Sequence, residues 1–79
     1  MKYKVLTWDE FREVCKEDAH NWFNSGYTAE DLTENDILSE YPEDYFDSEY
    51  QETDDLSSCF APQEFAATTI DYIRELQEV

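Results

Sequence analysis

The chain has no lysine or arginine between Glu17 and Ile73. These 57 residues hold 16 of the 21 acidic residues of the protein, and 12 of those 16 lie between Glu30 and Asp55. In the remaining parts of the chain, five acids stand against five bases, so the two ends are close to neutral. The sequence therefore combines a frame of ordinary mixed charge with an acidic middle that has no compensation. The five basic residues are Lys2, Lys4, Arg12, Lys16 and Arg74.

Length and apolar content predict one small folded domain over residues 1–79. With 41% hydrophobic and 16% aromatic residues, the chain can form one compact core and is too apolar to stay disordered. A domain of 79 residues has a thin stability margin. A net charge of −16 lowers that margin further through self-repulsion. A charge that is retained at such a cost suggests that the charge has a use.

Residues 7–24 carry the signals of an amphipathic helix. Thr7 and Glu10 have the spacing of a capping box, and Gly26 stands where a left-handed residue often ends a helix. Before this helix, we expect residues 3–6 to form a short strand or an extended arm on the core. The apolar stripe of the helix consists of Phe11, Val14, Cys15, Ala19, Trp22 and Phe23.

Residues 62–78 predict a second amphipathic helix. Pro62 suits the first helical turn, with Ala61 as N-cap and Glu64 at the third position. Phe60 and Phe65 occupy the two positions of a hydrophobic staple. Since neither long helix can bury its apolar face alone, we expect the two to pack on each other. The stripe of this helix consists of Phe65, Ala66, Thr69, Ile70, Ile73 and Leu76.

Residues 28–58 form the acidic central segment. Thr28 and Thr33 are each followed by acids, as at a helix start. Pro42 interrupts the pattern that follows and is expected to begin another short helix, with Tyr45, Phe46 and Tyr50 as apolar contacts. Residues 51–58 are expected to be a polar loop. The predicted fold is mostly α: two longer helices, with short helices and an acidic loop between them.

The spacing of the central acids suggests a surface that imitates nucleic acid. Glu40, Asp44 and Asp47 recur at i, i+4 and i+7, where like charges destabilise a helix. Carboxylates about 5–6 Å apart resemble the phosphates to which a cationic groove responds. Tyrosines among them add contact area typical of interfaces. The candidate partner-binding residues are Glu30, Asp31, Glu34, Asp36, Glu40, Glu43, Asp44, Asp47, Glu49, Glu52, Asp54 and Asp55, with Tyr41, Tyr45 and Tyr50.

The residues that catalysis needs are scarce, so we expect no enzyme. His20 is the only histidine and is expected on the polar flank of its helix, about 140° around the axis from Cys15. Cys15 and Cys59 have no metal-ligand or redox-motif spacing, and Cys15 is expected to be a buried apolar residue. Exposed carboxylates also lack the burial that raises the pKa of a general acid.

We expect no cofactor and no metal, since the acids do not form a calcium-binding loop and no phosphate-binding loop is present. The negative charge opposes direct binding to nucleic acid or to an anionic membrane. The N-terminal residues lack the apolar run of a signal peptide or membrane span, so a cytoplasmic location is expected.

The size, the stretch without cations and the tyrosines among the acids resemble small acidic inhibitors encoded by phages and mobile elements. These are DNA-mimic proteins, including anti-CRISPR and anti-restriction proteins, and they act in the host cytoplasm. The resemblance implies an inhibitor that occupies the basic groove of a nucleic-acid-binding protein, such as a CRISPR-Cas effector or a restriction enzyme. Two alternatives stay open. The first alternative is a small regulatory adaptor or antitoxin-like protein that binds through an aromatic-rich apolar surface. The second is that the acids form only a solvated face.

Overall fold

The computed structural model describes residues 3–42, 44–49, 52 and 56–78. In chain order the elements are strand β1 (Lys4–Thr7), helix α1 (Trp8–Asn24), the 3-10 helix η1 (Ala29–Asp31), helix α2 (Glu34–Leu38), strand β2 (Ser57–Phe60) and helix α3 (Pro62–Gln77). The predicted mostly helical character is confirmed, and a two-stranded antiparallel sheet is added to it. No helix in these described residues is long and apolar enough to cross a membrane.

Helix α1 begins and ends as its sequence predicts. Thr7 and Glu10 form the full capping box, since the Thr7 hydroxyl accepts from the Glu10 N–H and the Glu10 carboxylate accepts from the Thr7 N–H. At the other end Gly26 has a φ of 96°, and its N–H and that of Tyr27 bond back to Phe23 and Trp22. These are the two bonds of a Schellman motif. The expected apolar contact of that motif joins the Trp22 and Tyr27 rings, whose centroids lie 5.0 Å apart.

Helix α3 likewise begins where the sequence predicts. Pro62 occupies the first turn, and the Glu64 carboxylate accepts from the N–H of Ala61. Alanine has no side-chain acceptor, so only this half of a capping box forms. Phe60 and Phe65 are both buried, with ring centroids 6.2 Å apart. The predicted hydrophobic staple is therefore present, and it fixes the angle at which the chain enters α3.

The prediction of a polar loop over residues 51–58 is wrong for its last residues. Residues 57–60 form β2, which pairs antiparallel with β1 in the register Lys4↔Phe60 to Thr7↔Ser57. The sequence Ser-Ser-Cys-Phe has no clear alternation of apolar and polar residues, so it carries no local strand signal. The strand forms because β1 offers it a partner, which is a tertiary effect. Each strand leads directly into a long helix.

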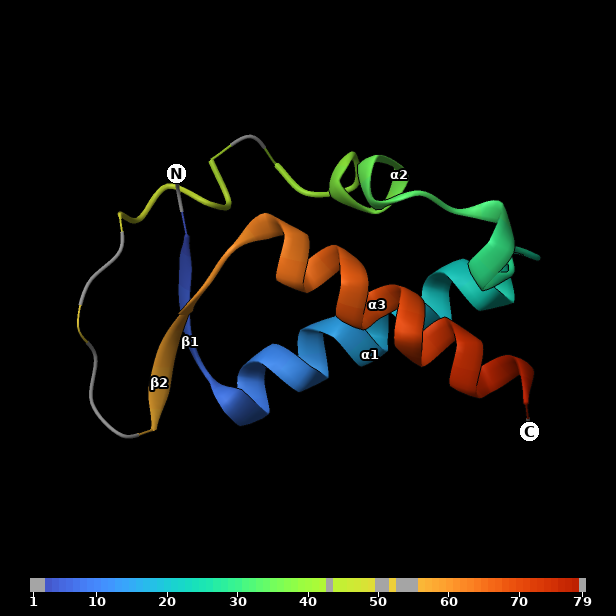
Figure 1. Ribbon diagram of the computed structural model, residues 1–79, viewed down its shortest axis with the longest axis horizontal. Coiled ribbons are helices and arrows are strands. Elements are labelled where there is room, and N and C mark those ends of the chain that lie inside the picture. The colour runs from blue at the N-terminus through green and yellow to red at the C-terminus, as the bar shows by residue number, and fades with distance from the viewer. Residues whose placement is uncertain (1–2, 43, 50–51, 53–55, 79) are drawn as a thin grey trace.

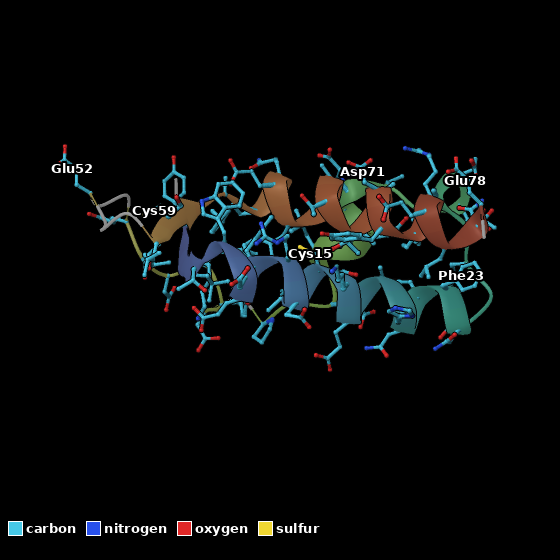
Figure 2. All side chains as sticks on the ribbon, turned by 90° about the horizontal axis from the view of Figure 1, so that it is seen from below. Cys15, Phe23, Glu52, Cys59, Asp71 and Glu78 are labelled. Atoms are coloured by element: carbon cyan, nitrogen blue, oxygen red, sulfur yellow. The ribbon has the colours of Figure 1, made fainter. Side chains whose placement is uncertain are left out.

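Helix α3 occupies the middle of the fold. Helices α1 and α3 lie side by side, and both run away from the sheet toward the same end of the molecule (Figure 1, Figure 2). The predicted packing of the two long helices on each other is confirmed. After α1 the chain turns at that far end, and η1 and α2 pack on α3 as the chain returns toward the sheet (Figure 1).

Two apolar clusters form the core. Near the sheet, the rings of Phe11 and Phe60 stack at a centroid distance of 4.0 Å, and both lie around the fully buried Phe65. Toward the far end, Ile37 of α2 and Ile73 of α3 are fully buried. The second cluster also contains Ala19, Ala29, Leu32 and Ala66. The core thus joins both long helices to the acidic central segment.

The helix predicted to begin at Pro42 does not form. The described residues 44–46 form a turn, in which the Tyr45 N–H donates to the Pro42 carbonyl. Ser48 then exchanges both backbone hydrogen bonds with Tyr3 in an isolated antiparallel bridge, which requires an extended chain. Uncompensated acids one turn apart also disfavour a helix here. The predicted starts at Thr28 and Thr33 are confirmed as η1 and α2, each a single turn or little more.

The pairing of β2 can be tested by a cross-link. Val5→Cys should form a disulfide with Cys59 under mild oxidation, because the two positions are direct partners and such pairs have Cα atoms about 4.5–5.5 Å apart, within disulfide range. Lys4→Cys is the control, since residue 4 faces the opposite side of the sheet. Peptide mapping by mass spectrometry identifies the linkage. No cross-link from Val5→Cys, or an equal yield from both variants, would contradict this register.

Candidate partner-binding surface

The described acids of the central segment are all on the surface. Nine of the twelve predicted acids lie in the described residues, and every one of them is exposed. Three of the described cations contact residues outside the central segment: Arg12 pairs with Asp9, Arg74 pairs with Asp71, and Lys16 lies over the Tyr72 ring. Lys4 lies over the ring of Tyr45 in the central segment. The nine exposed acids are Glu30, Asp31, Glu34, Asp36, Glu40, Asp44, Asp47, Glu49 and Glu52.

Three of these acids have a structural task as well. Asp31 accepts from the backbone and hydroxyl of Thr28, and Asp36 does the same with Thr33, so each carboxylate fixes the start of a short helix. Glu30 accepts from the Gln77 side chain, and this bond holds the pKa of Glu30 below its usual range. Hydrogen bonds within the protein therefore account for the presence of these three acids in the central segment.

The predicted row of carboxylates along one helix is wrong. Glu40 lies in the turn after α2, Asp44 lies in the turn after Pro42, and Asp47 precedes the extended bridge at Ser48. The three acids are exposed, yet no helix connects them at intervals of one turn. The remaining predicted residues Glu43, Tyr50, Asp54 and Asp55 lie outside the described residues.

Tyr41 and Tyr45 face the core more than a partner. Both are partly buried in the cluster around Phe65, with ring centroids 5.8 Å from the Phe65 ring. Burial raises the pKa of both tyrosines. Among the described residues, the large exposed aromatic rings come from other segments: Trp8 is 50% exposed and Tyr27 is 43% exposed. Tyr41 and Tyr45 therefore anchor the acidic segment to the core.

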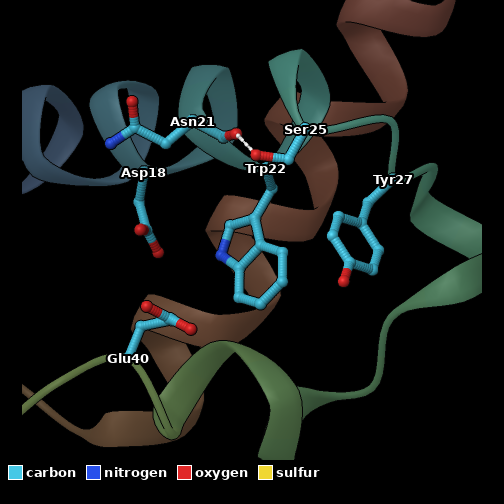
Figure 3. Close-up of a pocket in the computed structure, with 6 residues that line it drawn as sticks. All are labelled: Asp18, Asn21, Trp22, Ser25, Tyr27 and Glu40. Carbon is cyan, nitrogen blue, oxygen red and sulfur yellow. Dashed lines mark hydrogen bonds between the residues drawn. The ribbon is translucent and has the colours of Figure 1, made fainter.

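A hollow lies between the end of α1 and the turn after α2. It measures about 400 Å³ and is lined by Asp18, Asn21, Trp22, Ser25, Tyr27 and Glu40. Figure 3 shows the carboxylates of Asp18 and Glu40 pointing toward each other, with the Trp22 indole beside them. A smaller hollow of about 200 Å³ shares Asp18 and Asn21 and adds Glu17 and Tyr41. The two hollows together form an acidic groove along α1.

Asp18 is a partly buried carboxylate of this groove, and its pKa is raised. Burial raises the pKa of Asp18, and the nearby charges of Glu40 and Glu17 act in the same direction. Asp18 Oδ2 and the Tyr41 hydroxyl are both buried, and neither has a hydrogen-bond partner among the described residues. One oxygen of the Asp18 carboxylate is therefore left without a donor in the described part of the chain.

Sequence reasoning missed Asp18 and the hollow. The signal in the sequence is that Asp18 stands four residues after Val14 and four before Trp22, on the edge of the apolar stripe. A carboxylate at such a position has to face another segment. Which segment faces it depends on the path from α1 to α2, and the local sequence does not specify that path. Tyr27 was missed for the same reason.

The side chains with catalytic potential are not brought together. Cys15 is buried, and its thiol lies 3.8 Å from the Phe65 carbonyl oxygen, whereas His20 is exposed. Burial raises the pKa of Cys15 to about 11, so the thiol is protonated at neutral pH. Among the described residues, no group of three or more His, Cys, Asp or Glu side chains is placed to hold a metal ion. Comparison with protein-family models, curated proteins and solved structures gave no match to this chain.

The burial of Asp18 predicts a stabilising substitution. A buried acceptor without a partner costs about 1–3 kcal/mol, and partial exposure reduces this cost. We therefore expect Asp18→Asn to raise the free energy of unfolding at pH 7 by about 0.5–1 kcal/mol. The folded-state pKa of Asp18 is raised, so its ionised form destabilises the fold above the unfolded pKa of about 3.9. The gain should disappear below that pH. Urea titrations at several pH values measure it.

The matched control for this prediction is Glu13→Gln, which removes the same charge from an exposed position on the same helix. If both variants gain equally, relief of general repulsion explains the effect and the burial of Asp18 does not. A gain for Asp18→Asn that persists below about pH 3.9 would also contradict the assignment.

Proposed function

We propose that the protein is a non-enzymatic inhibitor that binds the basic groove of a nucleic-acid-binding protein and presents an acidic surface in place of DNA. The observation that carries the proposal is the exposure of all nine described acids of the central segment, in a stretch of 57 residues without a single cation. Partners of this kind include CRISPR-Cas effectors and restriction enzymes, and the place of action is the cytoplasm of the host cell.

The charge density of the molecule supports this role. The protein extends 37 Å along its longest axis and carries a net charge of −16. A DNA duplex has about one negative charge per 1.7 Å of axis, so the same length of duplex carries roughly 22 charges. The two densities are of the same order. A groove that responds to total charge therefore meets a similar potential in either ligand.

From the irregular path of the central segment we infer the mode of binding in the proposed mimicry. Because Glu40, Asp44 and Asp47 do not share a helix, they do not form the row of carboxylates one helical turn apart that the sequence suggested. Binding then depends on the sum of many exposed charges, which steer association and are screened by salt. The partly buried rings of Tyr41 and Tyr45 hold this loop-rich surface on the core, so less order has to form on binding.

The proposal predicts salt-sensitive binding that depends on the central acids. The immobilised protein should retain a nucleic-acid-binding protein from nuclease-treated bacterial lysate. Affinity for that purified partner should fall at least about tenfold between about 0.05 and 0.5 M salt. A variant with Glu40→Lys, Asp44→Lys and Asp47→Lys should weaken binding by at least about tenfold at low salt, because reversed charges repel a cationic groove.

The control variant carries Glu13→Lys, Glu75→Lys and Glu78→Lys, which change the net charge equally at exposed positions on or beside α1 and α3. It should bind nearly as the native protein does. Equal losses in both variants would show that only net charge matters, and unchanged binding in the central variant at both salt concentrations would refute the mimic.

A second candidate function has one observation in its favour. Trp8 and Leu56, which are 50% and 74% exposed, flank a shallow hollow at the sheet end of the molecule. Such a pair suits an adaptor or antitoxin-like protein that binds through apolar contacts. In that case Trp8→Ala and Leu56→Ser should abolish partner binding, and salt should have little effect on it. The nucleic-acid mimic predicts the reverse for both measurements.

A further inference from the structure

The hollow between the end of α1 and the turn after α2 combines negative charge with aromatic walls. Its two carboxylates come from distant parts of the chain, Asp18 from α1 and Glu40 from beyond α2, and both point into the same space (Figure 3). Trp22 and Tyr27 line the same hollow with rings at 82° to each other. A volume of about 400 Å³ leaves room for one long side chain and some water.

The carboxylates that line the hollow are not fully matched by hydrogen-bond donors among the described residues. Asp18 Oδ2 is buried and has no hydrogen-bond donor in the described part of the chain. The Glu40 carboxylate adds negative charge near Asp18, and Glu17 lines the adjoining hollow. A cationic donor placed between Asp18 and Glu40 would offset the repulsion between the two carboxylates and the cost of burying Asp18 as an anion. The lining therefore favours a cationic ligand.

A guanidinium group fits this lining better than an ammonium group or a metal ion. It is planar, carries five N–H donors in a fixed fork, and stacks on aromatic faces. The hollow offers acceptors on Asp18 and Glu40 together with the Trp22 ring. An ammonium group is a compact, strongly hydrated charge that makes less use of a flat ring. A third carboxylate, histidine or cysteine for a metal is absent from the described residues of the hollow.

We propose that this hollow binds an arginine side chain of the partner, whose guanidinium bonds to Asp18 and Glu40 and stacks on Trp22. The inference rests on the proposed function, because grooves that hold nucleic acid are rich in arginines that contact phosphate. The surrounding acids attract the partner from a distance, but they do not fix its orientation on the surface. One inserted arginine fixes the orientation of the complex, as a buried anchor does at other interfaces.

The test uses the free protein labelled with ¹⁵N and N-acetyl-arginine N-methylamide as the probe. The indole N–H signals report two places at once, because Trp22 lines the hollow and Trp8 begins the same helix at the other end. We expect a saturable shift of the Trp22 signal with little change at Trp8. N-acetyl-lysine N-methylamide should bind about fivefold more weakly, since it cannot form the bidentate fork.

Neutral variants locate the interaction. Asp18→Asn and Glu40→Gln should each weaken binding of the arginine probe by roughly tenfold, because each removes a charged hydrogen bond. Glu13→Gln, an exposed site elsewhere on α1, should leave binding unchanged. The same spectra show whether each variant remains folded. Unchanged affinity in Asp18→Asn, or equal and unsaturable shifts of both indoles, would overturn the proposal. So would a saturable shift with MgCl₂ and none with the arginine probe.

The result is independent of the partner class. Failure of the arginine probe alongside salt-sensitive partner binding would remove the docking point and leave the proposed function intact. Saturable arginine binding supports the docking point even where the partner proves not to bind nucleic acid, and the arginine would then belong to another class of protein.

Discussion

The burial of Phe65 among other aromatic rings is the interaction on which the fold depends. Phe65 is fully buried, and rings from three different parts of the chain surround it: Phe11 of α1, Phe60 of β2, and Tyr41, Tyr45 and Phe46 of the acidic central segment. Carboxylates cannot enter such a core without losing hydration. The rings therefore tie an acidic segment to the frame while its charges remain in water.

This arrangement explains how a small domain tolerates a net charge of −16. Short-range hydrogen bonds give some carboxylates a structural role, as Asp31 and Asp36 do at their threonines. All nine described acids of the central segment are exposed, where solvent and salt weaken their repulsion. Asp18 is the exception, because burial raises its pKa and leaves one oxygen without a donor. A cationic group of the partner that bonds to Asp18 would remove this loss of stability, and its binding would be favoured for that reason.

The sequence predicts what local signals control. The capping box at Thr7, the Schellman end at Gly26 and the staple of Phe60 and Phe65 each involve residues within a few positions, and all three are present. Strand β2 could not be predicted, because its four residues become a strand only beside β1. The helix expected after Pro42 failed for a similar reason, since Ser48 pairs with Tyr3 in an extended bridge. The hollow at Asp18 also depends on tertiary packing.

If the acidic surface takes the place of nucleic acid on its partner, a DNA duplex and the protein compete for one groove. Affinity of the purified partner for the labelled protein is determined in the presence of increasing concentrations of a DNA duplex. The apparent Kd should rise in proportion to the duplex concentration without limit, because one groove cannot hold both ligands. A plateau in the apparent Kd, together with a ternary complex of partner, duplex and protein, would contradict it.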